Sequence, residues 1–279
     1  MILVTGATGK IGVELVRLLT EAKAEARALL RDPAKAKGWE GIEVVKGDLD
    51  DGESIAAALR GVDTLLLLTA ANVKQELALI EAARRAGVER TVKISAVHAS
   101  IEARASLVRG HAESEAALQR SGMAWTLLRP GVFSQNFLSF APAIKAGGTF
   151  SASAKDGKIA PIDARDIAAV AAKALLEPGH EGKTYLLTGP VVLSYAEVAE
   201  KISAAIGKPV RYVDVPTAES RAAMLGAGMP KWLADDLVTI QVDTASGLLA
   251  AVSGDVEAVL GRSPRGFDDF ARDYAEAFR

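Results

Sequence analysis

Short apolar runs and stretches of helical periodicity alternate along the first half of the chain. The apolar runs predict buried strands at residues 2–4, 25–30, 42–46, 63–69, 90–95 and 124–129. Helical periodicity between these runs predicts helices near residues 13–19, 54–59, 74–86 and 105–121. Strand-then-helix units in this order are typical of a parallel sheet with helices on both faces. The pattern therefore predicts an α/β protein with a Rossmann-type, doubly wound parallel sheet.

The regular alternation of predicted strands and helices ends at Pro130. Beyond it we expect helices at 132–143, 163–176 and 194–206, a hairpin tip at 156–157, and strands at 183–187 and 210–215. The segment after Thr217 is predicted to be mostly helical, with an aromatic stripe of Phe267, Phe270, Tyr274 and Phe278. We therefore expect a sheet domain of residues 1–131 plus about 158–189. The remainder, about 132–157 and 190–279, would form a smaller, mainly helical C-terminal substrate lobe over the carboxyl edge of the sheet.

Three glycines join the first predicted strand to the first helix. Gly6 would permit a tight turn, Gly9 would let a ligand approach the backbone, and Gly12 would let the helix pack close to the strand. Unpaired N–H groups and the positive end of the dipole at such a helix N-terminus favour a pyrophosphate. An ordinary glycine-rich turn without a ligand is the alternative. The turn indicates an NAD(P)-binding domain if the rest of the chain agrees.

The end of the second predicted strand bears on the choice of cofactor. An acid at this point favours a free ribose 2′-hydroxyl, and an arginine favours a 2′-phosphate. Asp32 precedes Pro33 and can serve as a helix N-cap, a local role that needs no ligand. Arg31 has no such local role, although a solvated surface arginine is the alternative. We expect NADP(H) to be preferred, with NAD(H) as the second choice.

Composition narrows the class of partner and the chemistry. The chain has 279 residues, a formal net charge of −2 and no cysteine. Such a balance provides no basic field for nucleic acid or a membrane surface, and His98, His111 and His180 lack zinc-ligand spacing. No apolar run approaches the ~18 residues that span a bilayer, and the chain starts directly with a strand. We expect a cytoplasmic protein with a small-molecule partner and no metal, and a homodimer is one option for its assembly.

Several motifs together resemble one known family. They are Thr5-Gly-Ala-Thr-Gly-Lys-Ile-Gly12, Arg31-Asp-Pro33, Gly47-Asp48, a helix with His111 and Glu115, Trp125-Thr-Leu-Leu-Arg-Pro-Gly131 with Phe133 and Asn136, and Pro161-Ile-Asp-Ala-Arg-Asp166. This set resembles the NmrA-like branch of the atypical short-chain dehydrogenases/reductases. Within the branch it is most similar to the type-two NAD(P)H:quinone oxidoreductases and triphenylmethane (azo dye) reductases. The resemblance covers almost the whole chain.

The resemblance implies a position for each part of the cofactor. The pyrophosphate would lie on Gly6, Thr8, Gly9, Lys10 and Ile11, the 2′-phosphate on Arg31, and the adenine on Asp48 and Leu49. The adenosine ribose would lie along Leu68, Thr69 and Ala70, the nicotinamide ribose beside Ser95 and Ala96, and the nicotinamide ring on Pro130, Gly131 and Val132.

The acid pair of ordinary short-chain dehydrogenases is missing. That pair is a tyrosine with a lysine four residues later, and none of the four tyrosines has a lysine at this spacing. The corresponding helix carries His111 and Glu115 one turn apart, so the imidazole could donate a proton with Glu115 orienting it. A packing role for His111 is the alternative, because Leu107, Ser114 and Leu118 share its helical stripe.

The acceptor would lie beyond Gly131. Phe133 and Phe137 share one face of the predicted helix and could form a substrate wall or simply core, and Asn136 is a polar candidate beside them. The resemblance implies hydride transfer to a quinone, azo dye or similar conjugated acceptor, which can take its proton from water. The alternative is a non-catalytic NADP(H)-binding redox sensor, because the family also contains such regulators.

Overall fold

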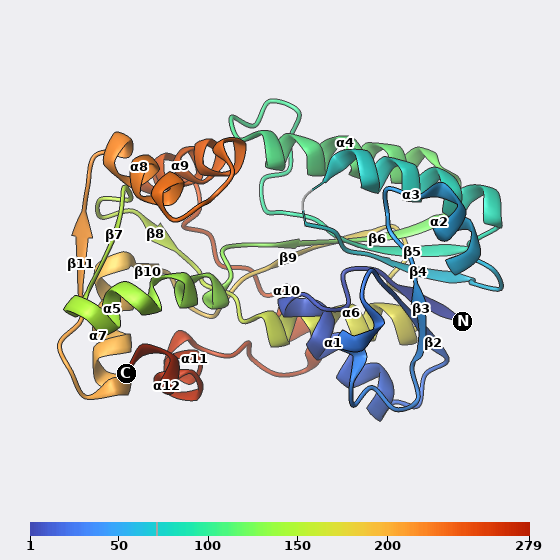
Figure 1. Ribbon diagram of the computed structural model, residues 1–279, viewed down its shortest axis with the longest axis horizontal. Coiled ribbons are helices and arrows are strands. Elements are labelled where there is room, and N and C mark those ends of the chain that lie inside the picture. Colours follow the sequence, from blue (N-terminus) through green and yellow to red (C-terminus); the bar gives the residue numbers. More distant parts are fainter. Residues whose placement is uncertain (71) are drawn as a thin grey trace.

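The computed structural model describes residues 1–70 and 72–279 and shows two lobes side by side (Figure 1). The larger lobe is built on a seven-stranded sheet with the strand order β3-β2-β1-β4-β5-β6-β9, in which every pairing is parallel. The strands are β1 (Ile2–Val4), β2 (Ala26–Leu30), β3 (Glu43–Lys46), β4 (Thr64–Leu67), β5 (Arg90–Ile94), β6 (Ala124–Pro130) and β9 (Lys183–Leu187). The order reverses between β1 and β4, where ligands bind in open parallel sheets. The prediction of a doubly wound Rossmann-type sheet is confirmed.

Helices cover both faces of this sheet (Figure 1). One face carries α1 (Lys10–Glu21), α6 (Ala164–Leu176) and α10 (Asp255–Leu260), and the other carries α2 (Gly52–Ala58), α3 (Val73–Ala86) and α4 (Ser106–Arg120). Successive strand residues point to opposite faces, so Leu66 belongs to the core under α1 and α6, whereas Leu65 and Leu67 belong to the core under α2, α3 and α4. The same alternation sends the side chain of Lys93 toward α3 and α4.

The smaller lobe has its own aromatic core. It contains the 3₁₀ segment η2 (Ser134–Phe140), α5 (Ala141–Gly147), α7 (Tyr195–Ile206), α11 (Phe267–Asp273) and α12 (Ala275–Phe278). Two short sheets complete it: β7 (Thr149–Ala152) pairs in parallel with β11 (Arg211–Asp214), and β8 (Lys158–Ile159) pairs antiparallel with β10 (Leu193–Ser194). The helices α8 (Thr217–Gly226) and α9 (Lys231–Ala245) lie between this core and α4 (Figure 1). The boundaries of the two domains stay a prediction; α10 contacts α6 and β9, on the sheet side.

Three local predictions need correction. The hairpin at Asp156-Gly157 does not form, because β7 and β8 on either side of it pair with β11 and β10. Gly157 is needed for a different reason: a Cβ there would lie 2.2 Å from the carbonyl oxygen of Thr244 in α9. The helix expected at 132–143 is instead η2 followed by α5. The first helix begins at Lys10 rather than near Val13, so it includes Gly12.

Within residues 1–70 and 72–279, no helix is long and apolar enough to cross a membrane. Ala71 lies outside the described residues.

Candidate active site

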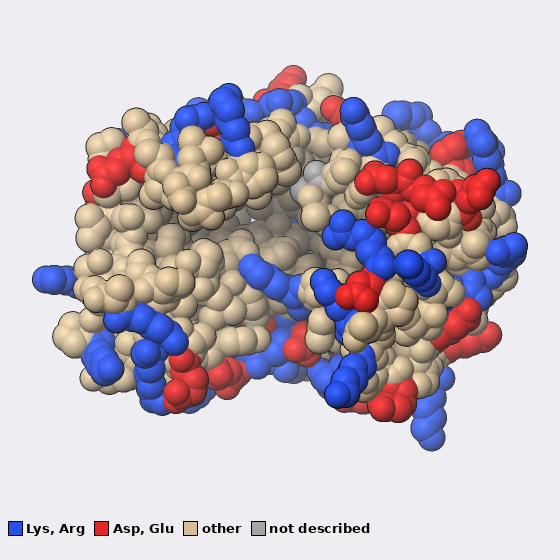
Figure 2. Space-filling view, viewed as in Figure 1, with Lys and Arg blue, Asp and Glu red and all other residues tan. Residues whose placement is uncertain are grey.

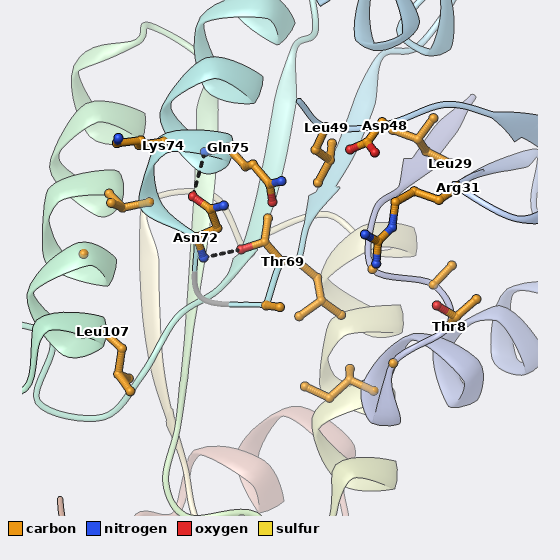
Figure 3. Close-up of a pocket in the computed structure, with 18 of the residues that line it drawn as sticks. Thr8, Leu29, Arg31, Asp48, Leu49, Thr69, Asn72, Lys74, Gln75 and Leu107 are labelled. Atoms are coloured by element: carbon orange, nitrogen blue, oxygen red, sulfur yellow. Dashed lines mark hydrogen bonds between the residues drawn. The ribbon is translucent and has the colours of Figure 1, made fainter. Parts of the chain in front are cut away.

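The carboxyl edge of the sheet opens into a cavity of about 1170 Å³. It lies at the ends of β1, β2, β3 and β4, and Figure 3 shows side chains from these strand ends and from α3 and α4 around it. The predicted cofactor residues that line it are Gly6, Thr8, Gly9, Lys10, Ile11, Arg31, Asp48, Leu49, Leu68, Thr69 and Ala70. The structure therefore brings the glycine turn, Arg31 and the residues expected at the adenosine half into one cavity.

The glycine turn at the base of this cavity is tightly packed. Gly6 has φ +64°, and a Cβ on it would lie 2.7 Å from the carbonyl oxygen of Leu68. A Cβ on Gly12 would lie 2.2 Å from the carbonyl oxygen of Gly6, so this glycine allows α1 to begin directly against the turn. Gly9 is the N-cap of α1. Gly6 and Gly12 thus have the turn and packing roles that the sequence predicts.

The first turn of α1 offers backbone donors to the cavity. Within the described residues, the amide nitrogens of Lys10, Ile11 and Gly12 have no backbone acceptor, while the nitrogen of Val13 bonds to the carbonyl oxygen of Gly9. These N–H groups stand at the positive end of a helix of 12 residues. The arrangement suits an anionic group such as a pyrophosphate.

Arg31 projects into the cavity from the end of β2. In Figure 3 its guanidinium lies between Asp48 and Thr8, and it makes no ion pair or side-chain hydrogen bond with any described residue. Its neighbour Asp32 caps the 3₁₀ turn η1 (Pro33–Ala36), accepting a hydrogen bond from the nitrogen of Ala34 at 3.1 Å. The local role expected for Asp32 is confirmed, and a second cation, Lys35, also lines the cavity. This end of the cavity can therefore hold a further anionic group.

The segment after β4 is tied to the start of α3 (Figure 3). Asn72 is the N-cap of α3; its side-chain oxygen accepts from the nitrogen of Gln75 at 3.3 Å, and its own nitrogen donates to Thr69 Oγ1 at 3.3 Å. The Thr69 hydroxyl donates in turn to Glu76 Oε1 at 2.9 Å. The wall expected along the ribose is thus connected to a carboxylate inside the protein.

A second cavity of about 940 Å³ continues beyond the first, between the two lobes. Lys10, Leu107 and Phe133 line both cavities. The remaining predicted residues that line the second cavity are Ser95, Ala96, His111, Pro130, Gly131, Val132, Asn136 and Phe137. Figure 2 shows an open hollow between the lobes whose walls are largely uncharged. The two cavities therefore adjoin, one at the glycine turn and the other a largely apolar chamber.

The apolar chamber takes its walls from both lobes. Met224 and Met229 line it, together with Leu233 and Leu237 of α9. Phe137 lines it as well but is 2% exposed, and its ring packs at 5.3 Å between centroids from Phe267 in the aromatic core. Phe137 is therefore a core side chain that also borders the chamber, and its contact with a substrate stays a prediction.

Lys10 lies where the cavities meet. Its Nζ donates to Asn136 Oδ1 at 3.0 Å and to the carbonyl oxygen of Gln135 at 3.2 Å. Partial burial lowers the pKa of Lys10 from its ordinary value. The polar side chain that we expect to meet the acceptor, Asn136, is thus held by a lysine that also borders the phosphate turn.

His111 meets a buried network rather than Glu115. Lys93 Nζ lies 3.3 Å from His111 Nδ1 and 2.6 Å from Glu76 Oε2. Burial, together with the charge of Lys93, lowers the pKa of His111 to about 4, although Glu76 and Glu115 act in the opposite direction. The imidazole is therefore neutral at pH 7.

The carboxylate of Glu115 contacts Ser95 and Arg129 rather than His111. Its Oε1 accepts from Ser95 Oγ at 2.5 Å and from Arg129 Nε at 2.9 Å. Glu115 is 4% exposed and, unlike every other predicted site residue, lines neither cavity. The expected contact in which Glu115 orients His111 is not made, because the carboxylate is engaged by Ser95 and Arg129 and a lysine stands beside the imidazole instead.

Sequence reasoning missed the residues behind the cavity wall. Lys93 and Glu76 lie in different elements, 17 positions apart in the chain, and no short motif joins them. The one available signal is the position of Lys93 in an otherwise apolar strand run, Arg90-Thr-Val-Lys-Ile-Ser95, where a buried cation needs a partner. In the described part of the chain no cluster of three or more histidine and acidic side chains is arranged to hold a metal ion.

Comparison with known proteins agrees with this geometry. The model of the NmrA-like family matches residues 1–258. The chain is 44% identical over 283 residues to the NAD(P)H azoreductase of Xenophilus azovorans, covering all of this chain and 99% of that protein. It resembles the NADPH-dependent quinone oxidoreductase of Escherichia coli complexed with NADPH, with a TM-score of 0.89 and 34% identity over 98% of this chain and 99% of that one. The triphenylmethane reductase of Citrobacter sp. complexed with NADP(H) gives a TM-score of 0.88 and 27% identity over 99% and 100% of the two chains. The chain belongs to the NmrA-like family.

Proposed function

We propose that this protein is an NAD(P)H-dependent oxidoreductase that prefers NADPH and transfers hydride to a quinone, an azo dye or a similar conjugated acceptor. The observation that carries the proposal is the pair of adjoining cavities, with the glycine turn in one and an apolar chamber in the other. The family membership and the printed activities of the azoreductase, quinone oxidoreductase and triphenylmethane reductase support the same reaction class.

The described residues fit the cofactor. The open N–H groups at the start of α1 would hold the pyrophosphate, Arg31 the 2′-phosphate, and Asp48 with Leu49 the adenine. Ser95 and Ala96 would lie at the nicotinamide ribose, and the backbone from Pro130 to Val132 behind the nicotinamide. When bound, NADPH supplies the hydride.

The chain's own groups would then act on the acceptor. His111, Phe133, Asn136 and Phe137 line the chamber in which the acceptor would meet the nicotinamide. We assign His111 as the group that contacts the reacting atoms, and Glu115 as a support that acts through Ser95. Most of the rate enhancement would come from orienting the two reactants in a chamber that excludes water, since the final proton can come from solvent.

The test is turnover with a panel of small quinones and azo dyes, followed by the loss of NADPH absorbance. We expect oxidation of NADPH well above the uncatalysed rate for at least one acceptor. A protein that binds NADPH tightly but reduces no acceptor in the panel would refute the reductase. That outcome would favour the second candidate, an NADP(H)-binding redox sensor, for which the absence of the Tyr/Lys pair from the sequence is the supporting observation.

The proposal extends to partners and location. We place the reaction in the cytoplasm, with a small-molecule acceptor and with neither nucleic acid nor membrane as partner. The formal net charge of −2 and the mixture of both signs of charge on the surface in Figure 2 support this. A homodimer is the assembly to test, by light scattering on the purified protein.

A further inference from the structure

A buried ion pair stands directly behind the imidazole of His111. The side chains of Lys93 in β5 and Glu76 in α3 are 0% and 1% exposed, and their Nζ and Oε2 atoms are 2.6 Å apart. A buried pair of this kind contributes little net stability, because both charges lose their hydration on folding. Because the pair lies behind the wall of the acceptor chamber, we look for its role in the site rather than in stability.

The hydrogen bonds of Lys93 determine the tautomer of His111. The three N–H groups of the ammonium have three acceptors: Glu76 Oε2 at 2.6 Å, His111 Nδ1 at 3.3 Å and the carbonyl oxygen of Ile94 at 3.4 Å. An ammonium group has no lone pair, so Nδ1 must accept. A neutral imidazole that accepts at Nδ1 carries its proton on Nε2.

The carboxylate of Glu76 favours the charged form of Lys93. Its carboxylate also accepts from Ser114 Oγ at 2.5 Å and from Thr69 Oγ1 at 2.9 Å. Burial by itself would raise the pKa of Glu76, but the charge of Lys93 and these hydrogen bonds lower it overall. Burial lowers the pKa of Lys93, and the carboxylate beside it opposes that shift. The pKa of Lys93 is lowered overall, with burial as the largest cause, while the 2.6 Å contact with Glu76 Oε2 favours the ammonium form; we take the pair as ionised on the strength of this contact.

The other ring nitrogen of His111 is open to the chamber. No described residue forms a hydrogen bond with Nε2, and the only fully buried side-chain polar atom without a partner among the described residues is Arg27 Nε. Nε2 is therefore accessible, and the chamber is the cavity that His111 lines. Besides Lys93 and Glu76, Glu115 on the same helix acts on the imidazole through its charge. Charged or titratable side chains that line the same chamber are Lys10, His98, Glu102, Arg104, Tyr195 and Asp243.

We propose that Lys93 and Glu76 are positioning residues that lock His111 as a neutral imidazole with its proton on Nε2, facing the acceptor as a permanent hydrogen-bond donor. This inference rests on the reductase function proposed above. When hydride forms a bond to the acceptor, the electron pair that it displaces collects on an oxygen or nitrogen of the acceptor. The Nε2–H group stabilises that charge, and a proton from water completes the reduction. A neutral donor also adds no positive charge beside a nicotinamide that becomes positive as the hydride leaves.

The tautomer can be observed directly. Only three histidines are present, so long-range ¹⁵N–¹H spectra of the full-length protein with NADPH bound can be assigned with one His111→Gln variant. We expect the Nε2–H pattern for His111, with no titration between about pH 5.5 and 8.5. An Nδ1–H pattern, or titration at the ordinary pKa of a histidine, would overturn the proposal. The measurement needs no acceptor, so it is independent of whether the protein reduces any compound.

Two variants test whether Lys93 and Glu76 fix the tautomer of His111. In Lys93→Met the cation is gone while Glu76 Oε1 remains 3.9 Å from Nδ1, so we expect His111 to become protonated on Nδ1 with a pKa above that in the unmodified protein. Turnover should acquire an inflection at that new pKa. The double variant Lys93→Met/Glu76→Gln has neither charge and should give a mixture of tautomers, which keeps the test valid if the single variant does not fold.

The matched control is Lys201→Met, which removes a lysine paired with Asp268 on the surface of the other lobe. It should keep the spectrum and the pH profile of the unmodified protein. Persistence of a single Nε2–H tautomer in either Lys93 variant would show that another contact fixes the ring, and would contradict the assignment.

Discussion

Arg31 provides the sharpest test of cofactor choice, because its removal breaks nothing else. The guanidinium is exposed, lines the first cavity and makes no ion pair or side-chain hydrogen bond with the described residues. Its substitution by alanine therefore leaves no buried partner uncompensated, and the loss should equal the lost contact with the 2′-phosphate. A charge-assisted hydrogen bond contributes about 1.5–3 kcal/mol, which is roughly a 10- to 150-fold change in Kd.

We expect Arg31→Ala to weaken NADPH binding by that factor and to leave NADH binding nearly unchanged, as measured by fluorescence titration of both cofactors. The adjacent variant Asp32→Ala is the matched control. It removes the cap of η1, should cost about 0.5–2 kcal/mol of stability, and should not change the ratio of the two affinities. Equal losses of NADPH and NADH affinity in Arg31→Ala would refute the assignment of the 2′-phosphate to this side chain.

Three further variants test other parts of the structure. Gly12→Ala places a Cβ 2.2 Å from the carbonyl oxygen of Gly6, so it should abolish NADPH binding or lower the Tm by several degrees, measured by calorimetry with and without cofactor. His111 has a pKa of about 4 in the folded protein and 6.5 in the unfolded chain, so the unfolded chain binds more protons between these pH values. The free energy of unfolding should therefore fall as the pH drops from about 6.5 to 4, by about 3 kcal/mol in all. Urea unfolding at a series of pH values should show this fall, and His111→Gln should flatten it; the same slope in both proteins would contradict the shift. Asp236→Ala removes a carboxylate of α9 that accepts hydrogen bonds from the backbone nitrogens of Ser106 and Leu107 at the start of α4. The free energy of unfolding should fall by about 0.5–2 kcal/mol, and the KM for the acceptor should rise. An unchanged Tm would show that Asp236 does not act as a cap of α4.

The features that local sequence dictates could be predicted. A parallel strand buried on both faces gives an apolar run in the sequence. A cap or tight turn needs a particular residue at a particular place, such as Gly6 in the glycine turn or Asp32 before Pro33. The sheet, its helices and the first cavity follow from such signals. The resemblance of the motifs to a known family added the expected position of the nicotinamide end.

Features that depend on distant partners could not be predicted. Gly157 reads as a hairpin tip, yet it is required by the close approach of Thr244 in α9, 87 residues later. The one-turn spacing of His111 and Glu115 suggests a contact, but Ser95, just after β5, and Arg129 of β6 donate hydrogen bonds to the carboxylate instead. In both cases a residue from another element competes for the group, and sequence spacing within one element carries no information about it.

The buried network gives a physical reason why the site can do without the Tyr/Lys pair of ordinary short-chain dehydrogenases. In that pair a lysine on the same helix stands one turn from the proton donor. Here the donor candidate, His111, is also on a helix, but the cation beside it comes from strand β5 and is held by Glu76 of α3. A cation near an imidazole favours its neutral form, so the same electrostatic element that assists a tyrosine leaves a histidine as a donor without a charge. Lys93, Glu76 and His111 all lie within residues 1–131, so the contacts of the imidazole with this pair involve no residue of the smaller lobe.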